Sequence, residues 1–230
     1  MIKKSKSLFA FTLAEVLITL GVIGVVAAMT MPTVIKKYQQ HVLETRLKKT
    51  YSLFNQAVKM AEAVEGPAKY WDKGLSGNEK ENSKKVAEKY ILPYVKAEYC
   101  DSGSTDNKCA KYVGCGSAAV NYNLSDGTMF SVCTYIATSD IIISISPMKT
   151  LKKGQGKFTF YINQDSGIFS PRYYDESLTH DDYINGYKVQ YGGGKITVAC
   201  SHNANAEYPY HACGALLYSE NWKIPKDYPW

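Results

Sequence analysis

The sequence predicts an α+β fold in which one long N-terminal helix packs on an antiparallel β-sheet, followed by a disulfide-stabilised C-terminal region. Three observations support this fold class. A helical pattern occupies residues 11–65, short β-branched and aromatic runs follow in residues 119–162, and all six cysteines lie beyond the helix. One face of such a sheet needs a cover, and the amphipathic part of the helix is the obvious one.

The first half of the helix, residues 11–35, is predicted to span a membrane. At 1.5 Å rise per residue, about 25 residues cross the roughly 30 Å hydrocarbon core of a bilayer. Glu15 is the only charged residue in this stretch. A carboxylate inside a membrane is costly without a cation beside it, so Glu15 requires a partner. Pro32 removes one backbone hydrogen bond and is expected to kink or locally melt the helix.

The second half of the helix, residues 36–65, is amphipathic. Apolar residues recur at intervals of three and four, while charged residues populate the other faces. Gly66-Pro67 ends the helix. This half is expected to pack on the head domain, residues 66–230, through the stripe Leu43, Leu47, Tyr51, Phe54, Val58 and Ala61.

A short basic leader, residues 1–10, precedes the apolar run. It carries three lysines and ends in small Ala10, after which the sequence continues Phe11-Thr12-Leu13-Ala14-Glu15. This arrangement resembles the prepilin leader of type IV pilins and type II secretion pseudopilins. The resemblance implies a pilin-like fold, cleavage by the prepilin peptidase between Ala10 and Phe11, and N-methylation of Phe11. It also implies that Glu15 pairs with the N-terminal amine of a neighbouring subunit.

The function implied by this resemblance is that of a structural subunit of a type IV pilus or a type II secretion pseudopilus, with no catalytic site of its own. Its partners would be copies of itself and other pilin-like subunits, the prepilin peptidase, the inner-membrane assembly platform and membrane lipid. The subunit would cross the inner membrane once, with a periplasmic or extracellular head, before it enters a filament. The alternative is a plain signal anchor in which Glu15 is a tolerated charge near one end of the span. The apolar run is too long for a secretory signal peptide.

Two other functional classes stay open. A minor pilin that binds DNA or a surface is one, because 19 tyrosines and a positive net charge permit aromatic and basic contacts. Removal of the three leader lysines lowers the net charge from +6 to +3, however, and no basic run is interleaved with aromatic residues, so nucleic acid is disfavoured as a partner. An enzyme is the other, with only Cys200 or Cys213 as a thiol nucleophile and His202 or His211 as its base.

The even number of cysteines in a non-cytoplasmic domain predicts disulfides. Six cysteines allow 15 pairings, and their clustering along the chain favours three local bridges. A zinc site is disfavoured, because no two cysteines are separated by two residues and the nearby histidines have no recognised zinc spacing. The favoured bridges are Cys100–Cys109, Cys115–Cys133 and Cys200–Cys213.

A meander of four antiparallel strands is predicted for the middle of the chain. Asp126-Gly127 is a strong hairpin turn between the first two strands, and a short amphipathic helix over residues 83–96 precedes them. The strands are expected at residues 119–124, 128–136, 141–145 and 157–162.

The residues after Gly167 are rich in tyrosine and turns, and their pattern assigns no elements. An acidic cluster here offers the hard oxygen ligands that calcium prefers, and some pseudopilins use a calcium ion in their C-terminal loop. Its spacing matches no EF-hand, so a solvated acidic loop is the favoured interpretation, with no cofactor required. The calcium candidates are Asp165, Asp175, Asp181 and Asp182. The two tryptophans and the tyrosine of residues 222–230 are expected to pack against the sheet as a terminal clasp.

Overall fold

The computed structural model describes residues 12–229 except 73, 75–76, 101–115, 135–139, 148–155, 164–165, 192 and 203–204. The chain divides into two units, Met1–Val42 and Leu43–Trp230, and the boundary lies inside the long helix α1, Leu13–Glu65. The predicted α+β class is confirmed, with a long apolar N-terminal helix, antiparallel sheet and a disulfide.

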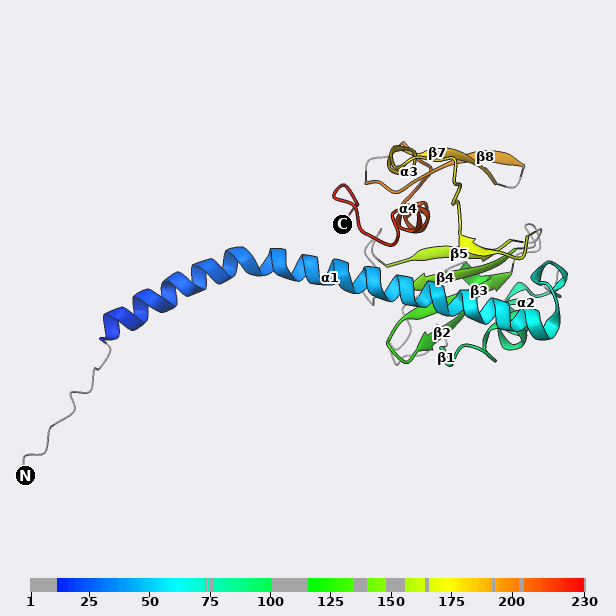
Figure 1. The fold of residues 1–230 in the computed structure, drawn as a ribbon, viewed down its shortest axis with the longest axis horizontal. Coiled ribbons are helices and arrows are strands. Elements are labelled where there is room, and N and C mark those ends of the chain that lie inside the picture. The colour runs from blue at the N-terminus through cyan, green and yellow to red at the C-terminus, as the bar shows by residue number, and fades with distance from the viewer. Residues whose placement is uncertain are drawn as a thin grey trace, which may run out of the picture. The chain divides into compact units, whose positions relative to one another are not determined.

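The helix α1 is drawn as one continuous ribbon (Figure 1), and Pro32 lies inside it. Of the kink or local melting expected at Pro32, the melting is therefore not seen. Its end at Glu65 is where the sequence predicts it. Gly66 has a φ of 83°, a left-handed conformation that favours glycine, and its N–H donates to the carbonyl of Glu62. The glycine therefore closes the last turn of the helix and redirects the chain.

The main sheet contains six antiparallel strands whose spatial order is their order in the chain. The four central strands are the predicted meander, and each begins within one residue of its expected start. The Asp126-Gly127 turn is also confirmed, with Gly127 at a φ of 81° and the Thr128 N–H bonded to the Asp126 carboxylate. Two short edge strands were not predicted. The strands are β1 (Ala97–Cys100), β2 (Val120–Leu124), β3 (Met129–Thr134), β4 (Ile141–Ser146), β5 (Phe158–Ile162) and β6 (Phe169–Pro171).

The second half of α1 covers one face of this sheet (Figure 1). Phe54 is fully buried, with its ring centroid 4.9 Å from that of Phe130 and 5.9 Å from that of Phe169. All six positions of the predicted stripe therefore pack on the core as expected. Tyr51 is half-buried, and the other five are buried: Leu43, Leu47, Phe54, Val58 and Ala61.

The segment between α1 and the sheet contains two successive helical elements, α2 (Glu79–Val86) and η2 (Ala87–Ile91). Helix α2 starts earlier than the predicted residue 83, because the side chain of Asn78 accepts hydrogen bonds from the N–H groups of Lys80 and Glu81 and caps it. The short helices η1 (Ala68–Tyr70) and η3 (Gly116–Ala118) complete this part of the head.

The C-terminal region, which the sequence left unassigned, is a second small sheet with two short helices. Strands β7 (Tyr187–Tyr191) and β8 (Gly194–Ala199) form an antiparallel hairpin, and β9 (Tyr208–Pro209) pairs parallel to β8. Helix α3 (His180–Asn185) precedes the hairpin and α4 (Cys213–Ser219) follows it.

The chain end forms the predicted clasp. Trp222 is buried, with its ring centroid 4.9 Å from that of Tyr51, and Tyr228 is buried as well. The Glu44 carboxylate of α1 accepts hydrogen bonds from the backbone N–H of Ile224 and from the ammonium of Lys223. The tail is thus tied to α1 by both apolar and polar contacts, while Trp230 lies outside the described residues.

Candidate assembly site and C-terminal region

Glu15 forms reciprocal hydrogen bonds with Thr12 at the start of α1. Its Oε2 accepts from the Thr12 backbone N–H at 2.8 Å and from the Thr12 hydroxyl at 2.9 Å, and the Thr12 Oγ1 accepts from the Glu15 N–H at 3.2 Å. This is a capping box, in which a threonine and a glutamate three residues later satisfy free N–H groups of the first helical turn. The signal is visible in the sequence as Thr-x-x-Glu before an apolar run, but this capping box was not predicted.

The capping box gives Glu15 a structural role within its own chain, beside the intersubunit role that the resemblance implies. The Oε2 oxygen of Glu15 accepts both hydrogen bonds from Thr12, and Oε1 bonds to no group among the described residues. The cleavage and methylation positions, Ala10 and Phe11, lie outside the described residues. The intersubunit pairing of Glu15 therefore stays a prediction.

The first half of α1 exposes an apolar surface on all sides. Within the described chain, α1 is the one helix that is long and apolar enough to cross a membrane. Two of its hydroxyl groups bond to the helix itself, since Thr19 donates to the Val16 carbonyl and Thr30 to the Val26 carbonyl. These two hydroxyls are therefore satisfied without an external partner, as an apolar environment requires. The exposed side chains include Leu13, Leu17, Ile18, Leu20, Ile23, Met29 and Val34.

Two glycines interrupt this apolar surface. A Cβ atom placed on Gly21 or Gly24 would meet nothing within 4 Å, so neither glycine is required by contacts within the chain. Small residues at such positions let the backbones of neighbouring membrane helices approach closely. The glycines are therefore free to serve helix–helix contacts.

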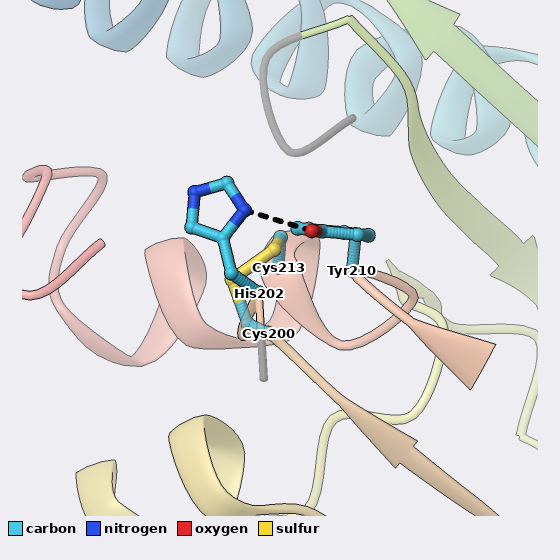
Figure 2. Close-up of a disulfide and its surroundings, with 4 residues drawn as sticks. All are labelled: Cys200, His202, Tyr210 and Cys213. Atoms are coloured by element: carbon cyan, nitrogen blue, oxygen red, sulfur yellow. Dashed lines mark hydrogen bonds between the residues drawn. A yellow bond between two sulfur atoms is a disulfide. The ribbon is translucent and has the colours of Figure 1, made fainter. Parts of the chain in front are cut away.

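Cys200 and Cys213 form a disulfide, the pairing that their spacing predicts (Figure 2). Both residues are fully buried, and the bond joins Cys200, the residue directly after β8, to the first residue of α4. Two backbone hydrogen bonds surround the crosslink. The Cys200 N–H donates to the carbonyl of Tyr183 in α3, and the Ala212 N–H donates to the carbonyl of Ala199 in β8. The disulfide therefore lies where α3, β8 and α4 meet.

Cys100 of β1 and Cys133 of β3 are also disulfide-bonded. Their predicted partners, Cys109 and Cys115, lie outside the described residues, so these two pairings stay predictions. With Cys200 and Cys213 bonded to each other, neither carries the thiol that the enzyme hypothesis needs. Figure 2 shows that His202 instead lies beside Tyr210, and its Nδ1 is 2.8 Å from the Tyr210 hydroxyl.

Two of the acidic candidates for calcium bond to their own turns. The Asp175 carboxylate accepts from the N–H and hydroxyl of Ser177, and Asp182 forms a capping box with Thr179 at the start of α3. Asp165 lies outside the described residues. In the described parts of the chain, no three histidine, cysteine, aspartate or glutamate side chains lie close enough together to hold a metal ion. Asp175, Asp181 and Asp182 therefore form no such group.

Comparison with known proteins places most of the chain in one family. A family of unknown function, DUF6613, matches residues 33–230. The chain belongs to DUF6613. No curated protein and no solved structure gave a match. The DUF6613 region starts directly after Pro32, so it contains the amphipathic end of α1 and the head, whereas Glu15 and most of the apolar run precede it.

The DUF6613 region contains a histidine held between two carboxylates. His180, the first residue of α3, places Nδ1 at 2.8 Å from a Glu220 carboxylate oxygen and Nε2 at 3.0 Å from an Asp227 carboxylate oxygen. The hydrogen bond to Asp227 is the main cause that raises the pKa of His180 above 6.5, and the bond to Glu220 adds to it. The same bond to His180 lowers the pKa of Asp227 below 3.8. The imidazolium form thus ties α3 to α4 and to the chain end.

We expect this contact to stabilise the DUF6613 head most between about pH 3.8 and 6.5. A raised histidine pKa contributes stability that is complete below 6.5 and is lost as the pH rises through the folded-state value, whereas the lowered Asp227 pKa contributes stability that is lost in acid. All three side chains are partly exposed, so the effect is small, roughly 0.2–1 kcal/mol. Thermal unfolding of wild type and His180→Gln across this pH range is the measurement. An equal difference at pH 5 and pH 9 would contradict the expectation.

Proposed function

We propose that this chain is a pilin-like subunit that assembles through its N-terminal helix into a type IV pilus or a type II secretion pseudopilus. The observation that carries the proposal is the division of α1 into two halves. The half that begins at Leu43 buries one face on the head sheet, while the half that ends at Ile35 exposes its apolar side chains on all sides. A single helix built in this way joins a water-soluble head to an apolar environment.

Such an apolar surface can be buried in lipid or against the helices of neighbouring subunits. In the subunit before assembly, we propose that the inner membrane covers it, with the head on the periplasmic side. In the filament, the same surface packs against the helices of neighbouring copies. The two glycines and the two self-bonded threonines described above suit close helix packing, because the glycines carry no side chain and the Thr19 and Thr30 hydroxyls are already hydrogen-bonded.

The charge on Glu15 supplies the specificity of assembly in this proposal. A carboxylate buried without a cation among apolar helices is strongly unfavourable, so a bundle forms readily only where a cation meets it. Cleavage after Ala10 would create that cation, the amine of Phe11, on each copy of the chain. Pairing of Glu15 with the amine of a neighbour then fixes the axial position of each incoming subunit. The prepilin peptidase and the inner-membrane assembly platform are the partners this requires.

We expect the assembled protein to begin at Phe11 with a methylated amine. Mass spectrometry of the N-terminal peptide from sheared filaments and from membranes is the measurement. Ala10→Gly keeps a small residue at the junction and should be processed, whereas Ala10→Leu places a bulky side chain there and should leave the leader attached. An intact Met1 in assembled wild-type material would contradict the pilin-like proposal and favour the signal anchor.

A further inference from the structure

A pocket of about 490 Å³ lies between the chain that follows β6 and the outer strand β7. Its volume falls in the roughly 300–1,000 Å³ range of small-molecule sites. Strand β7 contributes all five of its residues to the lining, and β5 contributes one tyrosine from the sheet face opposite α1. The lining includes the side chains of Tyr161, Arg172, Tyr173, Tyr187, Gln190 and Tyr191.

The aromatic wall of the pocket is held in place by contacts within the chain. The Arg172 guanidinium lies over two rings, 5.0 Å from the centroid of Tyr173 and 5.6 Å from that of Tyr191. Tyr173 has a φ of 69°, a backbone conformation that is strained for a bulky residue. The Tyr187 hydroxyl donates a hydrogen bond to the Tyr173 carbonyl and supports this conformation. Strain of this kind is concentrated at binding and catalytic sites, and here it orients a ring into the pocket lining.

The charges around the pocket are balanced. Arg172 and Lys188 carry positive charge, while Asp140 and Asp175 carry negative charge. A nucleic-acid strand is a poor fit to this lining, because its phosphates need a groove with excess positive charge. The lining instead offers both hydrogen-bond donors and acceptors around aromatic rings, from guanidinium, amide, carboxylate and phenol groups. This combination suits a neutral ligand with many hydroxyl groups.

We propose that this pocket binds a neutral carbohydrate unit of one or two hexose rings. A hexose presents a flat face of C–H groups that packs on a tyrosine ring, while its hydroxyl groups radiate toward the polar rim. Tyr191 is the best candidate for the stacking platform, because its side chain is 46% exposed at the pocket and already aligned by Arg172. Gln190 and the phenol groups are positioned to bond the hydroxyls. The proposal does not depend on filament assembly.

The test is ligand titration of the full-length protein in a detergent without a sugar headgroup, observed by saturation-transfer NMR. The probes are maltose, cellobiose, lactose and N,N′-diacetylchitobiose, with an oligothymidine strand as the nucleic-acid comparison. We expect at least one disaccharide to bind, and Tyr191→Ala to weaken that binding about tenfold. The matched control is Tyr70→Ala, which removes another exposed tyrosine that lies under a cation, here the Lys69 ammonium, and that does not line the pocket.

Each outcome decides the proposal. Binding that is lost in Tyr191→Ala and kept in Tyr70→Ala supports it. Binding that survives Tyr191→Ala places the ligand elsewhere and overturns it, as does binding of the oligothymidine in preference to every sugar. Failure of all four disaccharides to bind folded wild-type protein overturns it too. Near-UV circular dichroism, and a protein mass that corresponds to intact disulfides, establish that the protein is folded.

Discussion

A Glu15→Gln variant is expected to be inserted and cleaved normally yet to form few or no filaments. Glutamine keeps an oxygen that accepts the hydrogen bonds of Thr12, so the cap on α1 is retained. It removes the negative charge, so the amine of an incoming Phe11 has no counter-charge when the helices bundle. The measurement is electron microscopy of sheared fractions, combined with immunoblotting of the membrane pool.

A Thr12→Ala variant separates the two roles of Glu15. Alanine removes the hydroxyl that bonds to Glu15 in both directions, but it leaves the carboxylate in place. Under the assembly proposal, Thr12→Ala forms filaments and Glu15→Gln does not. If Glu15 served only as a helix cap, Glu15→Gln would assemble normally and Thr12→Ala would be the defective variant. Glu15→Val removes both the helix cap and the charge. A normal filament yield from this variant would mean that Glu15 is a tolerated charge, as the signal-anchor interpretation holds.

The elements that sequence patterns predict well here are those specified by neighbouring residues. The end of α1 depends on a glycine that adopts a left-handed conformation, and the β2–β3 hairpin depends on Asp126-Gly127, so both signals are local. The central strands have β-branched and aromatic runs that fit a buried sheet. Strands β1 and β6 are only four and three residues long, and their pairing with β2 and β5 depends on the rest of the sheet.

The candidate sites were predictable only in part, for a related reason. The sequence identifies Glu15 because a lone charge in an apolar run stands out. Acidic residues in a loop carry no such contrast, so Asp182 in a helix cap and Asp175 in a turn resembled calcium ligands. The tyrosine-lined pocket combines β5, β7 and the chain between them, and its shape depends on the conformation of Tyr173, which no residue pattern indicates.

Loss of the Cys200–Cys213 disulfide is expected to lower the free energy of unfolding of the head by about 3 kcal/mol. The two cysteines are 13 residues apart, and a crosslink of about this loop length stabilises mainly by restricting the unfolded chain. Both residues are fully buried, so alanine is the suitable replacement, because serine would add a hydroxyl without a partner. Urea unfolding of the full-length protein, followed by tryptophan fluorescence, is the measurement.

Non-additivity distinguishes loss of the crosslink from loss of packing. Cys200→Ala and Cys213→Ala each break the same bond, so either single variant should cost nearly as much as the double variant. If the two residues contributed only as buried side chains, the cost of the double variant would approach the sum of the two single costs. Alkylation and mass measurement without reductant should also find no free thiol in the wild type and one in each single variant. The disulfide ties the residue directly after β8 to α4, and beside it lies the backbone hydrogen bond from Cys200 to Tyr183 in α3. Loss of the disulfide should therefore first expose the C-terminal region to proteolysis, while the six-stranded sheet and α1 stay folded.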